Sequence, residues 1–255
     1  SHQAGLQSWI PFYKSTLKDD TINGIKVLRD SLYSSKLSQT HTNKVAENLY
    51  LHSSYTDTIL KIIIDSDLRE NTEYKYSDLG YYLLQKIIEQ NYAEKINKLV
   101  NKNIYNSIGM ENMGYLPLER LEKERIVPTE HDYVYRGQLL QGHVHDQGAA
   151  MLGGVGGHAG IFSNANDLAK IMQMYLELGE YGGEKYISKS TIKEFTRCQF
   201  CKSENRRGAG FDKPSLDEGG PTCQCVSSTS FGHTGFTGTI AWADPETEII
   251  YIFLS

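Results

Sequence analysis

The sequence has no long apolar run and no excess of positive charge. Its most apolar stretches, Ile59–Ile64 and Ile249–Leu254, are far shorter than the ~20 residues that a membrane-spanning helix requires, so we expect no membrane span. Lysine and arginine number 26 against 31 aspartate and glutamate residues, and the resulting net charge of −5 does not favour binding to nucleic acid. We therefore expect neither a membrane segment nor a nucleic-acid partner.

Internal repeats and low-complexity tracts are also missing, and 255 residues suit one globular unit or one and a half. The chain begins at Ser1 without a methionine or a signal peptide, and it ends directly after an apolar stretch. We expect a fragment, a partial domain in which residues 1–226 are mainly helix and loop and residues 227–255 form the strands of a sheet.

Apolar residues recur at helical spacing in several segments of the first part. Residues 1–43 are polar and rich in turn formers, so no long helix is expected there, and residues 112–150 are expected to form a long, loop-rich excursion. Helices are predicted over residues 54–65, 77–89 and 93–108, after the capping oxygens of residues 163–167, and over residues 188–195.

The end of the chain predicts neighbouring antiparallel strands. Ser230–Gly235, Thr239–Ala243 and Ile249–Leu254 are strand-like, and Asp244-Pro245 begins a tight turn between the last two. Small residues follow Phe231, so a substrate could lie against the backbone there, with the ring of His233 at the mouth. This pattern is typical of an active-site wall.

A second chemical cluster, Tyr76-Ser77-Asp78, opens the helix predicted over residues 77–89. Ser77 or Asp78 alone is most simply a helix cap. The combination with His233-Thr234-Gly235 favours a functional interpretation, because serine acyl-transfer sites of the penicillin-recognising type combine Ser-x-x-Lys, Tyr-x-Asn or Ser-x-Asn, and Lys-Thr-Gly in that order.

Four stretches in the right order make the chain resemble the class C β-lactamases and penicillin-binding-protein-like serine hydrolases. They are Ser1–Leu6, Tyr76–Tyr81, Gly157–Ser163 and His233–Gly238. The resemblance covers nearly the whole chain. It implies an α/β (α+β) fold of the β-lactamase/transpeptidase type, with an antiparallel sheet, flanking helices and a mainly helical subdomain.

The nearest variant of that family is an extra domain on some bacterial β-N-acetylglucosaminidases. This likeness implies a bacterial, extracytoplasmic protein, periplasmic or secreted, with an N-terminal glycosidase domain as a partner in the parent chain. The substrate would be a small molecule or a peptide.

The resemblance also assigns roles, in an acyl-enzyme mechanism that requires no cofactor. The catalytic residues would be Tyr76, whose phenol shuttles the proton, and His233, which stands where the family has lysine or histidine. His233 could hydrogen-bond Tyr76 or, when protonated, meet a substrate carboxylate. The substrate-binding residues would be Asp78, Thr234, Gly235, Phe236 and His158, with the backbone N–H of Phe236 in the oxyanion hole.

The nucleophile is the missing piece. Ser15-Thr16-Leu17-Lys18 matches Ser-x-x-Lys, but it lies in a polar run that cannot bury the serine and lysine on one face, and it follows the Ser1–Leu6 loop that the family's nucleophile precedes. We expect the true nucleophile upstream of Ser1. Asp78 departs from the family's asparagine and can only accept hydrogen bonds when ionised, which favours an ester, an amino-acid amide or a cell-wall-like peptide over a β-lactam.

Two groups of residues in the sequence are of types that bind metal ions. His143, His145 and Asp146 lack the spacing of a metallohydrolase, so we expect no catalytic metal there. Zinc and disulfides stay equally open for the four cysteines; because a Cys-x-Cys pair bridges poorly to itself, disulfides would run between the two pairs. The cysteines are Cys198, Cys201, Cys223 and Cys225.

The alternative function is a non-catalytic module of degenerate hydrolase fold that holds a peptide or glycan in its groove. An apolar-flanked Ser-x-x-Lys in the parent chain would support the enzyme, and its absence would support the binding module.

Overall fold

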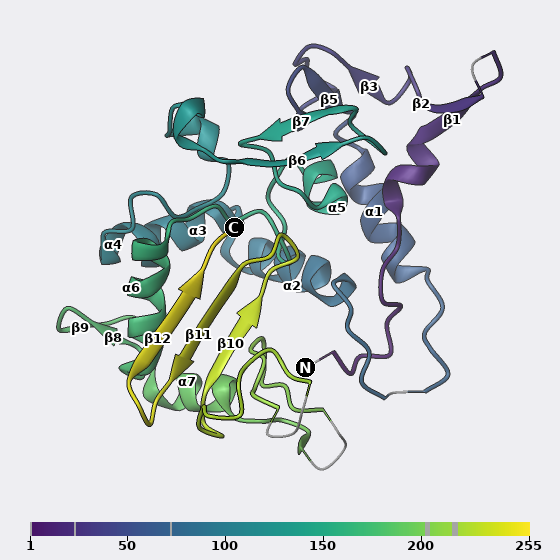
Figure 1. The fold of residues 1–255 in the computed structure, drawn as a ribbon. Helices are drawn as coiled ribbons and strands as arrows, with labels where there is room; N and C mark the ends of the chain where they lie inside the picture. Colours follow the sequence, from purple (N-terminus) through teal and green to yellow (C-terminus); the bar gives the residue numbers. More distant parts are fainter. Residues whose placement is uncertain (1, 23, 72, 202–204, 216–218) are drawn as a thin grey trace. The chain divides into compact units, whose positions relative to one another are not determined.

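The computed structural model describes residues 2–22, 24–71, 73–201, 205–215 and 219–255 (Figure 1). The described chain forms two compact units. One comprises Val100–Met113 and Ser163–Ser255, and the other comprises His2–Leu99 and Gly114–Phe162. Each unit is described by itself, and we name them the sheet unit and the helical unit.

The sheet unit contains the three predicted strands, and the prediction is confirmed. β10 (Phe231–Thr234), β11 (Ile240–Asp244) and β12 (Ile249–Phe253) form an antiparallel sheet in the order β10-β11-β12 (Figure 1). His233 lies opposite Ala241 in the register.

Helix α6 (Ala165–Leu176) packs against β11 and β12, as Figure 1 shows. The Asn164 side chain caps it by accepting the N–H of Asp167 at 2.8 Å, as the cap residues in the sequence predict. Side chains from α6 and the sheet form the unit's core; they include Ile171, Met172, Met174, Phe231 and Ala243.

The remaining elements of the sheet unit are short. The helix predicted over residues 93–108 consists of three consecutive pieces, and Gly109 ends it in the left-handed conformation with φ of +73°. The pieces are α3 (Ile96–Val100), of which only Val100 belongs to the sheet unit, the π-helical η2 (Asn101–Tyr105) and α4 (Asn106–Ile108). The unit also has the hairpin β8 (Glu180–Tyr181) and β9 (Glu184–Lys185), and α7 (Lys189–Thr196), which confirms the last predicted helix.

The helical unit contains the first two predicted helices, α1 (Tyr55–Ile64) and α2 (Leu79–Tyr92). Tyr55, Ile59 and Ile63 of α1 are buried, and they belong to one core with Leu79 and Tyr82 of α2. This spacing is the i, i+4 pattern from which the helices were predicted.

Short strands in the first 226 residues were not predicted. The segment expected to be a loop-rich excursion contains the hairpin β6 (Pro128–Asp132) and β7 (Gln138–Gln141), and then helix α5 (Gln147–Met151). These strands are too short and too polar for apolar alternation to mark them. Near the N-terminus lie η1 (Phe12–Thr16), β1 (Leu17–Asp20), β2 (Ile25–Leu28), β3 (Tyr33–Ser34), β4 (Asn43–Ala46) and β5 (Leu49–Leu51), and η3 (Pro117–Glu119) and η4 (Lys123–Arg125) precede β6.

Among the described residues, no helix is both long enough and apolar enough to cross a membrane.

Candidate active site

The Tyr76 motif stands at the start of α2, in the helical unit. Ser77 performs the capping function there: its hydroxyl accepts the N–H of Leu79 at 3.3 Å and donates to the carbonyl of Gln7 at 2.6 Å. The Asp78 side chain makes no capping bond. The capping role predicted for Ser77 or Asp78 therefore belongs to Ser77.

The N-terminal loop lies directly against this motif. The ring of His2 lies 4.3 Å from the ring of Tyr76, and its Nδ1 lies 3.2 Å from the backbone N–H of Ser77. Arg69 holds the same loop by donating to the carbonyls of Gly5 at 2.7 Å and of Leu6 at 3.1 Å. The Tyr76 side chain is 42% exposed, so it can be approached from solvent.

The His233 motif stands at the end of β10, in the sheet unit. After Thr234 the chain turns back to β11, and the N–H of Gly235 donates to the carbonyl of Thr239 at 2.7 Å. Phe236, whose N–H is the expected oxyanion donor, has a side chain that is 91% exposed at the tip of this turn. The motif is thus at the exposed end of a hairpin.

Gly232 explains how this strand lies so close to its neighbour. A Cβ at this position would lie 2.2 Å from the carbonyl oxygen of Ala241 and 2.5 Å from Cε3 of Trp242. The buried indole of Trp242 donates to the hydroxyl of Ser230 at 3.0 Å and fills the space that a side chain would need. Only glycine fits beside this indole.

The ring of His233 is held on both nitrogens. Nδ1 lies 2.6 Å from the carbonyl oxygen of Thr234, and Nε2 lies 3.0 Å from Nη1 of Arg207. Arg207 is buried and pairs with Asp212 at 3.4 Å. Sequence reasoning missed Arg207, because it lies 26 positions before His233 in an irregular segment with no motif of its own.

Tyr76 and His233 belong to different compact units. Their convergence on one cleft, like the catalytic and substrate-binding roles given to the two motifs, stays a prediction.

His158 is a buried residue. Its side chain is 3% exposed, its Nε2 lies 2.8 Å from Oδ1 of Asp146, and its ring stacks on Tyr82 with centroids 4.3 Å apart. Burial raises the pKa of Asp146, but the hydrogen bond and charge of His158 outweigh it, so the pKa lies below its ordinary value. Asp146 also caps α5 by accepting the N–H of Ala149 at 2.6 Å. These contacts favour a structural role for His158 over the predicted contact with substrate.

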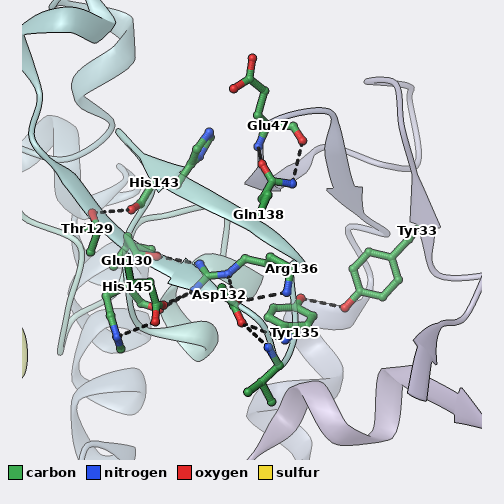
Figure 2. A network of polar contacts seen from close by, with 12 residues as sticks. Tyr33, Glu47, Thr129, Glu130, Asp132, Tyr135, Arg136, Gln138, His143 and His145 are labelled. Carbon is green, nitrogen blue, oxygen red and sulfur yellow. Dashed lines mark hydrogen bonds and ion pairs between the residues drawn. The ribbon is translucent and has the colours of Figure 1, made fainter. Parts of the chain in front are cut away.

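His143 and His145 lie in the polar network of Figure 2. His145 pairs with Glu130 at 3.1 Å. Burial and the nearby cations, Lys44 above all, lower the pKa of His143 to about 4. Within the described parts of the chain, no three His, Cys, Asp or Glu side chains are grouped so that they could hold a metal ion.

The expected pairing of the cysteines is wrong. Disulfides join Cys198 to Cys201 and Cys223 to Cys225, within each pair and not between the pairs. Close spacing along the chain predicts a strained bridge. The backbone nevertheless brings the two Cα atoms of each pair to 5.8 and 5.3 Å, within the ordinary range for a disulfide.

Neither Ser-x-x-Lys sequence in the chain looks like a nucleophile helix. Ser15 donates to the carbonyl of Phe12 at 2.7 Å, and Lys18 pairs with Asp30 on the surface. A second match, Ser190-Thr191-Ile192-Lys193, lies on α7, and its serine and lysine are both exposed. Neither lysine is buried, so desolvation cannot lower its pKa for catalysis.

Comparison with known proteins identifies the family of this chain. Residues 2–255 match the family model described as Beta-lactamase. The chain belongs to the β-lactamase family. It is 30% identical, over 98% of its length, to a protein of Escherichia coli K12 named "Putative D-alanyl-D-alanine carboxypeptidase", and 32% identical, over 80%, to one of the same name from Salmonella gallinarum. It spans 61% and 50% of the lengths of these relatives.

Solved structures show the same fold. D-amino acid amidase from Ochrobactrum anthropi matches with a TM-score of 0.55 at 14% identity, over 97% of this chain and 59% of that one. A penicillin-binding protein homologue from Caulobacter crescentus matches with a TM-score of 0.52 at 17% identity, over 77% and 57%. The β-lactamase/transpeptidase-like fold expected from the sequence is confirmed.

Proposed function

We propose that the chain is the larger part of a serine acyl-transfer hydrolase whose nucleophile lies in a segment ahead of Ser1. The observation that carries this proposal is the pair of family motifs, Tyr76-Ser77-Asp78 at the start of a helix and His233-Thr234-Gly235 at the end of a strand, in a chain of the β-lactamase family. Each motif keeps the local structure that the chemistry needs.

In the proposed mechanism, the upstream serine attacks a carbonyl carbon and its proton passes to the oxygen of Tyr76, which is a phenolate at this step. The backbone N–H of Phe236 donates to the oxygen of the tetrahedral intermediate. The acyl-enzyme forms as the leaving group departs with the proton, and water then releases the acyl group by the reverse sequence. No step requires a cofactor.

The substrate class follows from chemistry and relatives together. Asp78 accepts but does not donate hydrogen bonds when ionised, so a substrate group that donates, such as an amide N–H or an ammonium, suits this position. The curated relatives are named for a D-alanyl peptide and the amidase for a D-amino acid amide. We propose an amino-acid amide, an ester or a cell-wall-like peptide as the substrate.

The location is proposed on two grounds. A cell-wall-like substrate lies outside the cytoplasm, and the two disulfides suit an oxidising compartment. We propose a periplasmic or secreted bacterial protein, with a glycosidase domain as a candidate neighbour in the parent chain.

A fluorophosphonate probe followed by mass spectrometry tests the proposal. We expect one adduct per molecule on a serine ahead of Ser1 in the longer protein, and none on the 255-residue chain. In the longer protein, Tyr76→Phe should slow labelling by about 10²- to 10⁴-fold, because it removes the proton shuttle. An adduct on Ser15 or Ser190 would refute the upstream nucleophile.

The alternative is a non-catalytic module that binds a peptide or glycan. The exposed positions of both Ser-x-x-Lys lysines favour it. It predicts that the longer protein stays unlabelled while still binding a cell-wall peptide in calorimetry.

A further inference from the structure

The contacts of the His233 ring determine which of its nitrogens carries the proton. A guanidinium group can only donate hydrogen bonds. Because Nη1 of Arg207 lies 3.0 Å from Nε2, this nitrogen must be the acceptor and carry no proton. The proton of the neutral ring then sits on Nδ1, which donates to the carbonyl oxygen of Thr234 at 2.6 Å.

A second proton would disrupt this arrangement. Protonated Nε2 would point an N–H at the N–H of Arg207, and it would place two positive charges about 3 Å apart. The geometry therefore favours a ring whose Nε2 accepts the hydrogen bond from Arg207.

Arg207 cannot easily move away from the ring. Its side chain is 10% exposed, and its partner Asp212 is 4% exposed. The backbone of Asp212 exchanges two hydrogen bonds with Gly232, of 2.8 and 3.1 Å, so the carboxylate is anchored to the residue that precedes His233. The backbone carbonyl of Arg207 also accepts the N–H of Gln199 at 3.0 Å.

A second guanidinium group, that of Arg206, also contacts the carboxylate of Asp212. Nη2 of Arg206 lies 2.9 Å from Oδ2 of Asp212, and the Arg206 side chain is more exposed than that of Arg207. Two guanidinium groups thus face one carboxylate. The ammonium of Lys213, the next cation along the chain, donates instead to the carbonyl of Thr229 at 2.7 Å.

We propose that Arg207 is a positioning residue of the hydrolase: anchored by Asp212, it fixes the ring of His233 with Nε2 as a hydrogen-bond acceptor and with Nδ1 as the nitrogen that donates to Thr234. The effect on catalysis rests on the proposed function, whereas the state of the ring does not. His233 then acts through the orientation of its ring.

Nitrogen-15 NMR of the 255-residue chain tests the ring state directly. Among its eight histidines, His233 is assigned by the signal that His233→Gln removes. At pH 7 we expect a neutral ring with a protonated Nδ1 and an unprotonated, hydrogen-bonded Nε2. A protonated Nε2, or an imidazolium, would overturn the proposal without any further variant.

Two matched variants test the role of Arg207. Arg207→Leu should shift the Nε2 resonance toward that of a nitrogen without a donor, and Arg207→Lys should restore part of the shift. Arg206→Leu removes the other guanidinium from Asp212 and should leave the ring signals unchanged. Fluorescence of the buried Trp242 reports whether each variant keeps the sheet unit folded. Equal spectra for the two leucine variants would overturn the proposal.

Kinetics of the longer protein separate this proposal from the proposed function. Arg207→Leu should lower kcat by roughly 10- to 100-fold with a smaller change in KM, because a misplaced catalytic group costs rate more than binding, while Arg206→Leu should not. An unchanged kcat in Arg207→Leu would refute the positioning role. An inactive longer protein with the expected NMR signals would refute the proposed function and leave the ring assignment intact.

Discussion

Replacing Asp132 with asparagine should remove the centre of the polar network drawn in Figure 2. The carboxylate is buried, and it accepts the backbone N–H groups of Val134 and Tyr135 at 2.9 Å and the N–H of Arg136 at 3.2 Å. It also accepts Nε of Arg136 at 2.6 Å, from a side chain that is 0% exposed. Asparagine keeps the shape but removes the charge and presents an NH₂ group to these donors.

The size of the loss follows from what remains for Arg136. Breaking a buried ion pair by removing one partner typically costs about 3–5 kcal/mol, because the other charge stays buried. Glu130 still pairs with Arg136 at 3.2 Å, and the carbonyls of Val144 and His145 still accept from it at 2.7 and 2.6 Å. We therefore expect a decrease of about 3 kcal/mol in the free energy of unfolding, at the lower end of that range.

The pH dependence gives a second, independent sign. Burial raises the pKa of Asp132, but hydrogen bonds from Arg136 and the backbone outweigh it, so the pKa in the folded chain lies below its ordinary value of 3.8. The stabilisation is then complete above the pKa of the unfolded chain, and it is lost as the pH falls through the lower folded-state pKa. The difference between wild type and Asp132→Asn should shrink below about pH 4.

Urea unfolding measures both effects, followed by near-ultraviolet circular dichroism of the Tyr33 and Tyr135 pair, whose hydroxyls lie 2.7 Å apart in the same unit. The control is Asp65→Asn, which removes the exposed i, i+4 partner of Lys61 and should leave the midpoint nearly unchanged. The reasoning fails if Asp132→Asn lowers the midpoint no more than this control does, or if its effect is as large at pH 3 as at pH 7.

Two further substitutions test close packing. Gly232→Ala should destabilise the sheet unit by about 1–3 kcal/mol and alter the fluorescence of Trp242, because the new methyl group overlaps the indole and a carbonyl oxygen. The control is Gly80→Ala, which should not destabilise the chain, because the nearest atom would be 3.7 Å from the new methyl group. Equal effects of the two substitutions would contradict the predicted clash. His158→Leu should cost about 1–3 kcal/mol in urea unfolding because it removes the partner of a partly buried carboxylate, that of Asp146. His131→Leu, which removes an exposed ring with a similar stack on tyrosine, should cost much less.

The elements that the sequence predicts best are those whose own residues determine their burial. In α1, Tyr55, Ile59 and Ile63 lie on one face, and their spacing alone predicts the helix and its buried side. The strands β10, β11 and β12 are consecutive in the chain and antiparallel, so turn residues and apolar runs were sufficient to predict them. Local signals predicted these elements.

The residues that the sequence did not reveal are those whose partners lie far away in the chain. Nothing in the local sequence of Arg207 indicates that it donates to His233, and the pairing of His2 with Tyr76 joins residues 74 positions apart. The short strands β6 and β7 are likewise joined by a hydrogen-bonded turn centred on Asp132, and not by an apolar pattern. Such contacts depend on tertiary structure that periodicity cannot encode.

The residues that hold the His233 motif in place bear on the choice between an enzyme and a degenerate binding module. A groove that only holds a peptide has no need of a buried guanidinium beside His233, and burying that charge has a free-energy cost that its pairing with Asp212 offsets only in part. A hydrophobic side chain of similar volume would stabilise this part of the fold at least as well. A chain under no demand from chemistry could replace the pair of Arg207 and Asp212 with apolar residues without losing stability. The presence of Arg207, anchored through Asp212 to the strand that carries His233, supports the proposed enzyme over the binding module.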